Sequence, residues 1–342
     1  MKVGVIGLGD MGRQHVRVYD ELDDVELVAV ANCDPHALDR ATRRRFARGY
    51  VDYREMLERE DLDAVSVVVP TSSHHSVALD VIDRGIGVLV EKPIASDSRK
   101  ALEMITRAEC AHVLLAVGHI ERVNPAIVEL RRQLQNGALG RVFQIKARRA
   151  GPFPARVRDV GVAIDLATHD LDLMLQLAGS GIERIYGETM RNIHTLHEDM
   201  LFALIRFSDG TIGSLDVNWL TPNKVRDLTL VGARGMFVVD YLRQELFLSE
   251  NGTVPTRWDR LSMLTGVSEG RTIRFVTQHV EPLHAELQSF IEAVRNKTTP
   301  VVTGRDGLQA LVVAEAILAS AAAGCAVCLE PGSARVPVAA GA

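Results

Sequence analysis

The sequence predicts an α/β domain with a parallel sheet, followed by an α+β domain with an open, mainly antiparallel sheet. The chain has 342 residues, which corresponds to about two domains of ~150 residues each. Over the first 120 residues, strands that are apolar throughout alternate with amphipathic stretches, as in a parallel sheet covered by helices on both faces. After Asn124-Pro125, strands of alternating polarity are joined by tight turns, as in an antiparallel sheet. We therefore place the domains at residues 1–120 and 121–342.

The first domain contains five predicted strands and five predicted helices in alternation. The strands are rich in Val, Leu and Ile and span Lys2–Ile6, Glu26–Ala31, Ala64–Val69, Gly87–Val90 and Val113–Val117. The helices have amphipathic spacing and span Met11–Tyr19, Pro35–Arg45, Tyr53–Arg59, Ser76–Arg84 and Ser98–Cys110. The polar run Ser96-Asp97-Ser98 supplies an N-cap for the last of them.

Helices and strands are grouped differently in the second domain. A helix over Ala126–Gln135 ends at the stop signal Asn136-Gly137, and a strand over Arg141–Arg149 follows it. The very apolar segment Val162–Leu177 predicts a buried helix. The next strands are separated by turn sequences and span Leu201–Phe207, Thr211–Val217 and Met236–Tyr241. Two final helices are predicted around His284–Arg295 and Asp306–Ala322.

The composition excludes several classes of protein. Hydrophobic residues make up 47% and charged residues 24%, which excludes a disordered polymer, a fibrous repeat and a small disulfide-stabilised scaffold. The net charge of -5 argues against a nucleic-acid partner, and no apolar run reaches the ~20 residues that cross a bilayer. Met1-Lys2 leads directly into the first strand, so no secretory segment is expected. We therefore expect a cytoplasmic protein without a membrane or nucleic-acid partner.

The cysteine and histidine motifs predict no metal site. The four cysteines fit a reducing compartment, in which they need not pair. Cys325 and Cys328 form a single C-x-x-C without the second ligand pair of a zinc site, so we expect a structural role. His194 and His197 precede Glu198-Asp199, but their i, i+3 spacing at the start of a strand directs them to two faces. A place for His197 in a substrate pocket stays open.

The segment Gly7-Leu8-Gly9-Asp10-Met11-Gly12 has the spacing G-x-G-x-x-G between a strand and a helix. In this position the first glycine permits the tight turn, the second lets the backbone approach a pyrophosphate, and the third lets helix and strand pack closely. The N-terminus of the helix then points at the phosphates. These six residues predict a Rossmann domain that binds a dinucleotide.

The end of the second strand bears on the choice between NAD and NADP. An acidic residue there binds the ribose 2′-hydroxyl of NAD, but this chain has Asn32 at that position and Asp34 two residues later. No arginine follows directly to bind a 2′-phosphate, since Arg43, Arg44 and Arg45 lie a helix away. We predict NAD as the cofactor, with Asn32 and Asp34 at the ribose, and NADP as the alternative.

Two segments carry candidate catalytic residues. Glu91-Lys92-Pro93 follows a strand at the carboxyl edge of the parallel sheet, where a lysine can stabilise an alkoxide-like oxygen. In the second segment Asp165, His169 and Asp172 have i, i+4, i+7 spacing, which predicts one polar face of an apolar helix, directed at a cleft. His169 can transfer a proton near neutral pH, and a carboxylate one turn away can orient it. The alternative is a histidine that is satisfied within a domain interface.

Together these motifs resemble the GFO/IDH/MocA oxidoreductase family over essentially the whole chain. The matching pieces are the glycine motif, Val69-Pro70-Thr71 with His74, Glu91-Lys92-Pro93, Gly118-His119, and Asp165 with His169 and Asp172. The resemblance implies that the first domain binds NAD(P) and that the second forms the substrate site on its sheet. It implies that Lys92, Asp165 and His169 are catalytic, and that Pro70, Thr71, His74, Glu91 and Lys92 line the nicotinamide end. It also implies a homodimer or homotetramer, assembled through the open sheet.

Further segments are similar to those family members that oxidise the 3-hydroxyl of UDP-N-acetylglucosamine to a ketone. They are residues 118–125, 148–162, 197–199 and 218–224. Within them, arginines form a basic strip before the apolar helix, and arginine binds phosphate oxygens well, so a diphosphate fits. The strip consists of Arg148, Arg149, Arg156 and Arg158. Substrate-binding residues are then expected at His119, Arg122, Arg149, Arg156, Arg158, Asp172 and Trp219.

The sequence thus predicts an NAD-dependent dehydrogenase that acts on a nucleotide sugar. His169, assisted by Asp165, would remove the hydroxyl proton, and Lys92 would stabilise the alkoxide, although the proton roles of Lys92 and His169 can be exchanged. One alternative is an inositol or simple-sugar dehydrogenase of the same family, for which Arg156 and Arg158 are dispensable. Another is a non-catalytic sugar-sensing regulator on the same fold, which would be expected to lack Lys92 or His169.

Overall fold

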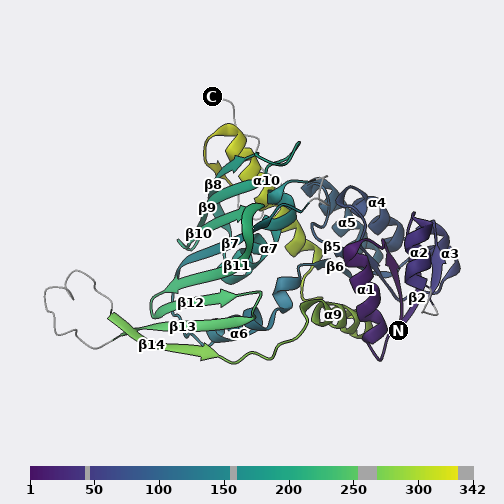
Figure 1. Cartoon of the computed structure of the whole chain (residues 1–342), viewed down its shortest axis with the longest axis horizontal. Helices are drawn as coiled ribbons and strands as arrows, with labels where there is room; N and C mark the ends of the chain where they lie inside the picture. The colour runs from purple at the N-terminus through teal and green to yellow at the C-terminus, as the bar shows by residue number, and fades with distance from the viewer. Residues whose placement is uncertain (43–46, 155–159, 253–267, 330–342) are drawn as a thin grey trace.

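The protein is built on two sheets of different topology, as a computed structural model shows (Figure 1). The structure describes residues 1–42, 47–154, 160–252 and 268–329. A six-stranded sheet comes from the first part of the chain and a nine-stranded sheet from the rest. The predicted fold class is confirmed, whereas the boundary at residue 120 stays a prediction.

The first sheet is that of a Rossmann domain. Its strand order is β3-β2-β1-β4-β5-β6, and all neighbours are parallel. The strands are β1 Lys2–Ile6, β2 Glu26–Ala31, β3 Arg48–Tyr50, β4 Ala64–Val67, β5 Gly87–Glu91 and β6 Leu115–Gly118. The sequence predicts all of them except β3. This edge strand has only three residues, two of them exposed, so it carries no apolar pattern.

Helices cover both faces of this sheet (Figure 1). They are α1 Asp10–Glu21, α2 Pro35–Thr42, α3 Tyr53–Arg59, α4 Thr71–Ile82 and α5 Ser98–Ala111. Asp97 caps α5 as predicted, because its side chain accepts a hydrogen bond from the backbone N–H of Lys100. The predicted start of α4 at Ser76 is wrong by five residues. Pro70 precedes its first turn, where a proline's missing N–H costs nothing.

The second sheet has the strand order β14-β13-β12-β11-β7-β10-β9-β8-β15. Its neighbours are antiparallel except for β7 and β10. The strands are β7 Val142–Pro152, β8 Ile182–Met190, β9 Met200–Phe207, β10 Ile212–Asn218, β11 Leu220–Gly232, β12 Gly235–Asp240, β13 Glu245–Gly252, β14 Ser268–Phe275 and β15 Val327–Cys328. The chain enters this half through the 3-10 turn η1 Ile120–Val123 and the helix α6 Pro125–Gln135.

The apolar helix that precedes β8 is not regular over its whole length. It begins with a π-helical turn, η2 Ala163–Ala167, and continues as α7 Thr168–Ala178. A π turn changes the direction of the side chains that precede it relative to those that follow it, and such turns are frequent at functional sites. The prediction of one straight polar stripe from Asp165 to Asp172 therefore needs correction.

The two final helices return to the first sheet. α9 Pro282–Asn296 packs against α1, and α10 Gly304–Ala323 contacts α5 and β6 as well as α7 and β8. The close approach of α10 requires glycine at Gly307, where a Cβ atom would lie 2.9 Å from the Val117 side chain. α10 is long and apolar enough to cross a membrane by length and composition, which corrects the expectation that no segment is. In this fold 56% of its apolar 18-residue stretch is buried, as in a core helix.

Candidate active site

The glycine motif forms the turn between β1 and α1, and each glycine has the geometry that the motif predicts. Gly7 has φ +99°, and a Cβ atom there would lie 2.2 Å from the Val68 carbonyl oxygen. A Cβ atom at Gly12 would lie 1.9 Å from the Gly7 carbonyl oxygen, so helix and turn touch. Gly9 has no atom within 4 Å of the position of a Cβ, and it begins α1 without a side-chain cap. This open helix N-terminus fits a pyrophosphate.

Asn32 and Asp34, which are predicted to lie at the ribose, both bind backbone N–H groups. The side-chain oxygen of Asn32 accepts a hydrogen bond of 3.0 Å from the backbone N–H of Leu8, so it ties the end of β2 to the glycine turn. Asp34 accepts one of 2.9 Å from the backbone N–H of His36 at the start of α2. An amide at position 32 therefore has a structural use that an acidic residue could also serve, since both offer an acceptor oxygen.

The predicted nicotinamide-end residues lie after β4 and β5. Pro70 and Thr71 begin α4. The ring of His74 lies between the carbonyl oxygens of Val69 and Pro93, at 2.9 and 2.8 Å, and burial lowers its pKa. His74 therefore joins the end of β4 to the turn that presents Lys92, and acts on the site through that turn.

Glu91 also stabilises the turn that presents Lys92. Its carboxylate contacts His15 Nε2 at 3.1 Å and accepts a hydrogen bond of 3.1 Å from the backbone N–H of Lys92. Burial raises the pKa of Glu91, but the hydrogen bond and charge of His15 outweigh this, so the pKa is lowered. Glu91 is thus an ionised group behind Lys92.

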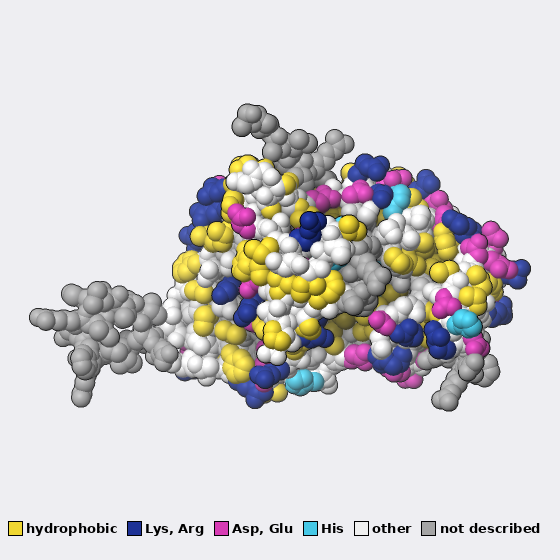
Figure 2. Space-filling model, turned by 45° about the horizontal axis from the view of Figure 1, so that its top comes forward, with side chains coloured by type: hydrophobic (Ala, Val, Ile, Leu, Met, Phe, Trp, Pro, Cys, Tyr) yellow, Lys and Arg dark blue, Asp and Glu magenta, His cyan; other side chains and the backbone are white. Residues whose placement is uncertain are grey.

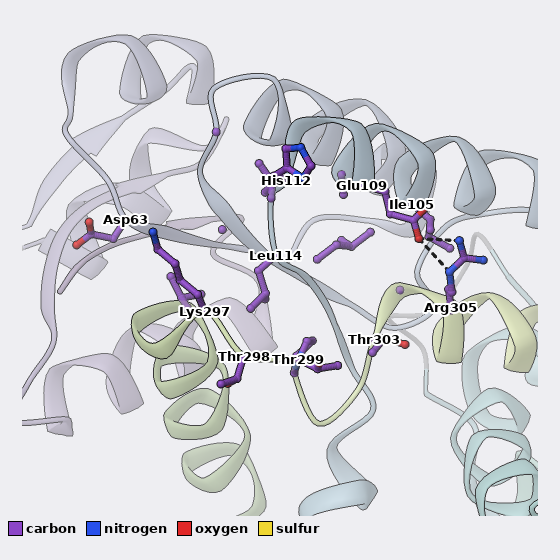
Figure 3. Close-up of a pocket in the computed structure, with 18 residues that line it drawn as sticks. Asp63, Ile105, Glu109, His112, Leu114, Lys297, Thr298, Thr299, Thr303 and Arg305 are labelled. Atoms are coloured by element: carbon purple, nitrogen blue, oxygen red, sulfur yellow. Dashed lines mark hydrogen bonds and ion pairs between the residues drawn. The ribbon is translucent and has the colours of Figure 1, made fainter.

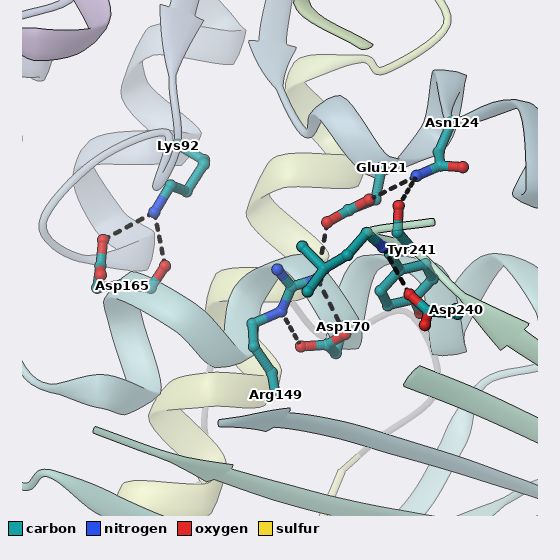
Figure 4. A network of polar contacts seen from close by, with 9 residues as sticks. Lys92, Glu121, Asn124, Arg149, Asp165, Asp170, Asp240 and Tyr241 are labelled. Carbon is teal, nitrogen blue, oxygen red and sulfur yellow. Dashed lines mark hydrogen bonds and ion pairs between the residues drawn. The ribbon is translucent and has the colours of Figure 1, made fainter. Parts of the chain in front are cut away.

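Lys92 connects the two halves of the molecule. Its Nζ donates to the backbone oxygen of Asp165 at 2.6 Å and to Oδ1 of the same residue at 2.7 Å (Figure 4). Both side chains are about 15% exposed, so the pair lies in a shielded place that still opens to solvent. Asp165 belongs to the π turn, and its backbone oxygen and its Oδ1 both face the lysine. A lysine held in this way has a fixed Nζ position at the carboxyl edge of β5.

His169 lies beside His119, which follows β6. The two rings meet edge to face with their centres 5.9 Å apart. In both rings Nδ1 is enclosed without a hydrogen-bond partner among the described residues, which leaves Nε2 as the accessible nitrogen. Burial, followed by the charge of Lys92, lowers the pKa of His169 well below 6.5. His169 is therefore neutral at pH 7 and able to accept a proton.

Arg149 lies in a buried network and not in an open groove (Figure 4). Its guanidinium binds Asp170 at 2.6 and 3.2 Å and Glu121 at 3.0 Å, and its side chain is 2% exposed. The prediction that Arg149 binds a substrate phosphate does not fit this geometry, because carboxylates already engage its donors. Arg149 instead joins β7, α7 and η1.

Arg122 and Asp172 form a second buried pair, with contacts of 2.6 and 2.7 Å. Arg122 also contacts Asp306 at the start of α10, at 3.2 Å. Asp172 is 1% exposed, so it faces this arginine and not the cleft. The expectation that these two residues bind substrate does not fit; they fasten α7 and α10 to η1.

The remaining expected substrate residues fall into two groups. Trp219 is 2% exposed and stacks on His194 with ring centres 6.2 Å apart, as a core tryptophan does. Nδ1 of His194 accepts the backbone N–H groups of Leu196 and His197, and no group of three metal-ligating side chains occurs among the described residues. Arg156 and Arg158 lie outside the described residues.

Arg226 on β11 is a candidate that the sequence analysis missed. The register pairs it with Arg149, so both side chains lie on the sheet face that carries α7. Its charge lowers the pKa of His169, which places it near that candidate catalytic residue. The carboxylates of Glu121, Asp170 and Asp165 act on it through their charge, but among the described residues none forms an ion pair with it, in contrast to Arg149. Only the strand register, which joins residues far apart in sequence, could have revealed it.

A cavity lies at the amino edge of the first sheet, opposite the edge that carries Lys92 (Figure 3). It has a volume of about 730 Å³ and is lined by the starts of three strands, at Asp63, Gly87 and Leu115, and by Lys297 and Arg305. Ligands of open α/β sheets bind at the carboxyl ends of the strands, and these are the amino ends. The size of this cavity is therefore no reason to place the catalytic site there.

Comparison with known proteins shows the family of this chain. Residues 1–119 match the model of the oxidoreductase family's NAD-binding Rossmann fold, and residues 131–329 match its C-terminal alpha/beta domain. The chain belongs to the GFO/IDH/MocA oxidoreductase family. Relatives in this family are named sugar dehydrogenases, which confirms the prediction of an oxidoreductase. The family model of the first domain is NAD-binding, and similar structures are solved with NADH or NAD+, which confirms NAD as the cofactor.

Three relatives of this GFO/IDH/MocA member show the range of the family. UDP-N-acetylglucosamine 3-dehydrogenase from Acidithiobacillus ferrooxidans is 30% identical over 316 residues, covering 92% of this chain and 95% of the relative. Its solved structure superposes with a TM-score of 0.83 over 94% and 98% of the two chains, at 28% identity. Myo-inositol 2-dehydrogenase from Thermotoga maritima is 24% identical over 92% and 94% of the chains. The WlbA dehydrogenase from Bordetella pertussis, solved with NADH and UDP-GlcNAcA, is 25% identical with a TM-score of 0.79 over 96% and 99%.

Proposed function

We propose that this dehydrogenase oxidises the 3-hydroxyl of UDP-N-acetylglucosamine, or of a related nucleotide sugar, to a ketone. The observation that carries the proposal is the placement of Lys92 Nζ, fixed by Asp165, near the neutral ring of His169 at the carboxyl edge of the Rossmann sheet. This arrangement offers one positive charge and one base to a single hydroxyl group.

Each residue has a distinct task in this reaction. Nε2 of His169 accepts the proton of the hydroxyl, and Lys92 stabilises the oxygen that becomes negative. Asp165 fixes the position of Lys92, which replaces the earlier expectation that it chiefly assists His169. NAD, when bound, would accept the hydride from the carbon that carries this hydroxyl. The open N-terminus of α1 at Gly9 positions the cofactor through its phosphates.

Arg226 supports a substrate that carries negative charge. It is the arginine near His169 whose guanidinium is not engaged by a carboxylate among the described residues, in contrast to Arg149. A partly shielded guanidinium binds a phosphate through two parallel hydrogen bonds, which an uncharged sugar cannot reproduce. The similarity to the Acidithiobacillus ferrooxidans enzyme points to the same class of substrate.

NADH formation with UDP-N-acetylglucosamine tests this function, and Arg226→Ala tests the role of the arginine. We expect turnover by the native enzyme, and a KM for the nucleotide sugar that rises about 10-fold or more in the variant, since a hydrogen bond to a charged group contributes ~1.5–3 kcal/mol. The kcat should change little, because Arg226 binds the part of the substrate that does not react.

Arg148→Ala is the matched control for this experiment. Arg148 is the sequence neighbour of Arg149, its side chain is 43% exposed, and it pairs with Asp216. It should leave the KM unchanged. Turnover with myo-inositol but not with the nucleotide sugar would support the alternative of an inositol dehydrogenase. One of the relatives is named as such an enzyme. No turnover with either, despite NAD binding, would support the sugar-sensing regulator.

We also propose that the enzyme is a homodimer or homotetramer that assembles through the outer face of the second sheet. Hydrophobic side chains are exposed on the sheet half of the molecule (Figure 2). Tyr186, Phe202 and Leu204 are 38%, 48% and 56% exposed, and the register brings Tyr186 opposite Leu204. Leu204→Asp should yield a smaller species than the native enzyme in sedimentation velocity. Val51→Asp, at an exposed site of the first domain, should not, and equal sizes in all three proteins would refute the interface.

The compartment is part of the same proposal. Cys33, Cys110, Cys325 and Cys328 are all exposed and free. Exposed thiols stay reduced in the cytoplasm, whereas an oxidising compartment would pair or modify them. We therefore expect the enzyme to act in the cytoplasm.

A further inference from the structure

Glu286 on α9 is a buried carboxyl group that the proposed reaction does not use. It is 7% exposed, and both carboxyl oxygens are enclosed without a hydrogen-bond partner among the described residues. An ionised carboxylate in such a place is very unfavourable, so the group either becomes neutral or binds a polar partner. α9, the helix that carries Glu286, packs against both α1 and η1.

A small cavity lies between α9 and the end of β6, with Glu286 and His119 among the residues that line it. Its volume of about 20 Å³ is enough for one water molecule, which needs ~10–15 Å³. Three polar residues line it: Glu286, Ser289 on the same face of α9, and His119. His119 Nδ1 is also enclosed without a partner among the described residues, while the ring itself lies against His169. A water molecule between the two residues would provide a partner for one carboxyl oxygen of Glu286 and for the imidazole nitrogen.

The surrounding charges place a proton on Glu286. Burial raises its pKa well above 4.5, and the charges of Glu91 on β5 and Glu121 on η1 raise it further. Glu91 itself stays ionised, because His15 and Lys92 compensate it. Two carboxyl groups in one buried region thus take opposite states. Tyr19 on α1 also faces this region. Its hydroxyl is hydrogen-bonded to that of Ser66 at 2.7 Å, and burial raises its pKa, so the phenol stays neutral.

We propose that Glu286, uncharged, donates a hydrogen bond through one enclosed water molecule to Nδ1 of His119, and thereby fixes the tautomer of that ring. The water donates to Nδ1, so the ring proton resides on Nε2, the nitrogen on the accessible side. His119 then offers a hydrogen-bond donor beside His169, and cannot take the substrate proton in its place. Glu286 is a positioning residue, and this role rests on the proposed function of His169.

The protonation state is tested first, by infrared difference spectroscopy at pH 7 without substrate. We expect the C=O stretching band of a protonated carboxyl group in the native enzyme, lost in Glu286→Gln and retained in Glu292→Gln. Glu292 is an exposed glutamate on the same helix and is the matched control. A native spectrum without that band, or a band that Glu286→Gln leaves in place, would overturn the proposal.

The tautomer is tested by the ¹⁵N chemical shifts of the His119 ring, again without substrate. We expect the Nε2–H form in the native enzyme and in Glu286→Gln, since glutamine retains an N–H donor, and a mixture of forms in Glu286→Leu. In kinetics, Glu286→Gln should keep most of the kcat. Glu286→Leu should lower the kcat by about 10- to 100-fold, the effect of a misplaced catalytic neighbour, with an unchanged KM for NAD.

Unchanged ring shifts in a folded Glu286→Leu would refute the coupling. If that variant does not fold, Glu286→Met takes its place, because methionine also lacks a donor and is close to glutamate in length; unchanged ring shifts in it would refute the coupling equally. Both spectroscopic measurements are made without substrate. An absence of turnover with the nucleotide sugar would therefore contradict the proposed function without affecting the result for Glu286 and His119.

Discussion

Lys92→Met is expected to lower the kcat by about 10²- to 10³-fold, with little change in the Kd for NAD. Removing one preorganised group that stabilises a developing negative charge typically has an effect of this size. Lys92 is shielded and fixed at 2.6 and 2.7 Å from two oxygens of Asp165, so no other described cation can take its exact place. Methionine retains the length of the side chain and removes the charge. Steady-state kinetics and NAD titration measure the two effects.

Lys2→Met is the control for this variant, since Lys2 is an exposed lysine at the amino end of β1, with an ion pair to Asp61. It should leave the kcat unchanged. A Lys92→Met enzyme with near-native kcat would refute the role of the lysine, and an equal loss of NAD affinity would make Lys92 a cofactor-binding residue only.

The pH profile provides a second readout of the same variant. Catalysis needs neutral His169, so activity is present above its pKa and lost as the pH falls through it. Burial and the charge of Lys92 both lower that pKa below 6.5, so the acid limb of kcat/KM in the native enzyme should lie below pH 6.5. In Lys92→Met the limb should move to higher pH, because one of these causes is removed. An acid limb at the same pH in both enzymes would contradict the proximity of Lys92 and His169.

Arg149→Met is expected to lower the free energy of unfolding by about 3–5 kcal/mol. The substitution leaves Asp170 and Glu121 buried without their partner, and removing one member of a buried ion pair has this cost. Urea unfolding followed by circular dichroism measures the change. Arg148→Met is the control, with an effect of about 1 kcal/mol or less, because its ion pair with Asp216 is exposed on one side.

The result also distinguishes two functions of this arginine. A large loss of stability supports the structural network of β7, α7 and η1. Native stability combined with a raised KM for the nucleotide sugar would instead return Arg149 to the phosphate-binding role that the sequence suggested.

Local patterns were sufficient for the Rossmann half. Apolar strands, amphipathic helices and the glycine spacing at Gly7, Gly9 and Gly12 are each set by residues close together in sequence, and the structure has them with small shifts. The candidate catalytic residues Lys92, Asp165 and His169 were also found from sequence, through motifs at a strand end and on a helix. Their meeting across the two halves was an expectation of family resemblance, and the Lys92–Asp165 contact has the distances of an ion pair.

Long-range contacts decided the rest. The π turn at Ala163–Ala167 separates Asp165 from Asp172, which helical spacing alone would place on one face. Whether an arginine is engaged or free depends on carboxylates from other elements, so only the tertiary structure distinguishes Arg149 from Arg226. The same holds for Glu286, whose helix lies some 170 residues beyond His119 in the chain and shares a cavity with it. A sequence determines which residues can form strands, helices and ligand turns, because those follow from neighbours. The environment of a charged group follows from packing, and packing joins residues that the sequence keeps apart.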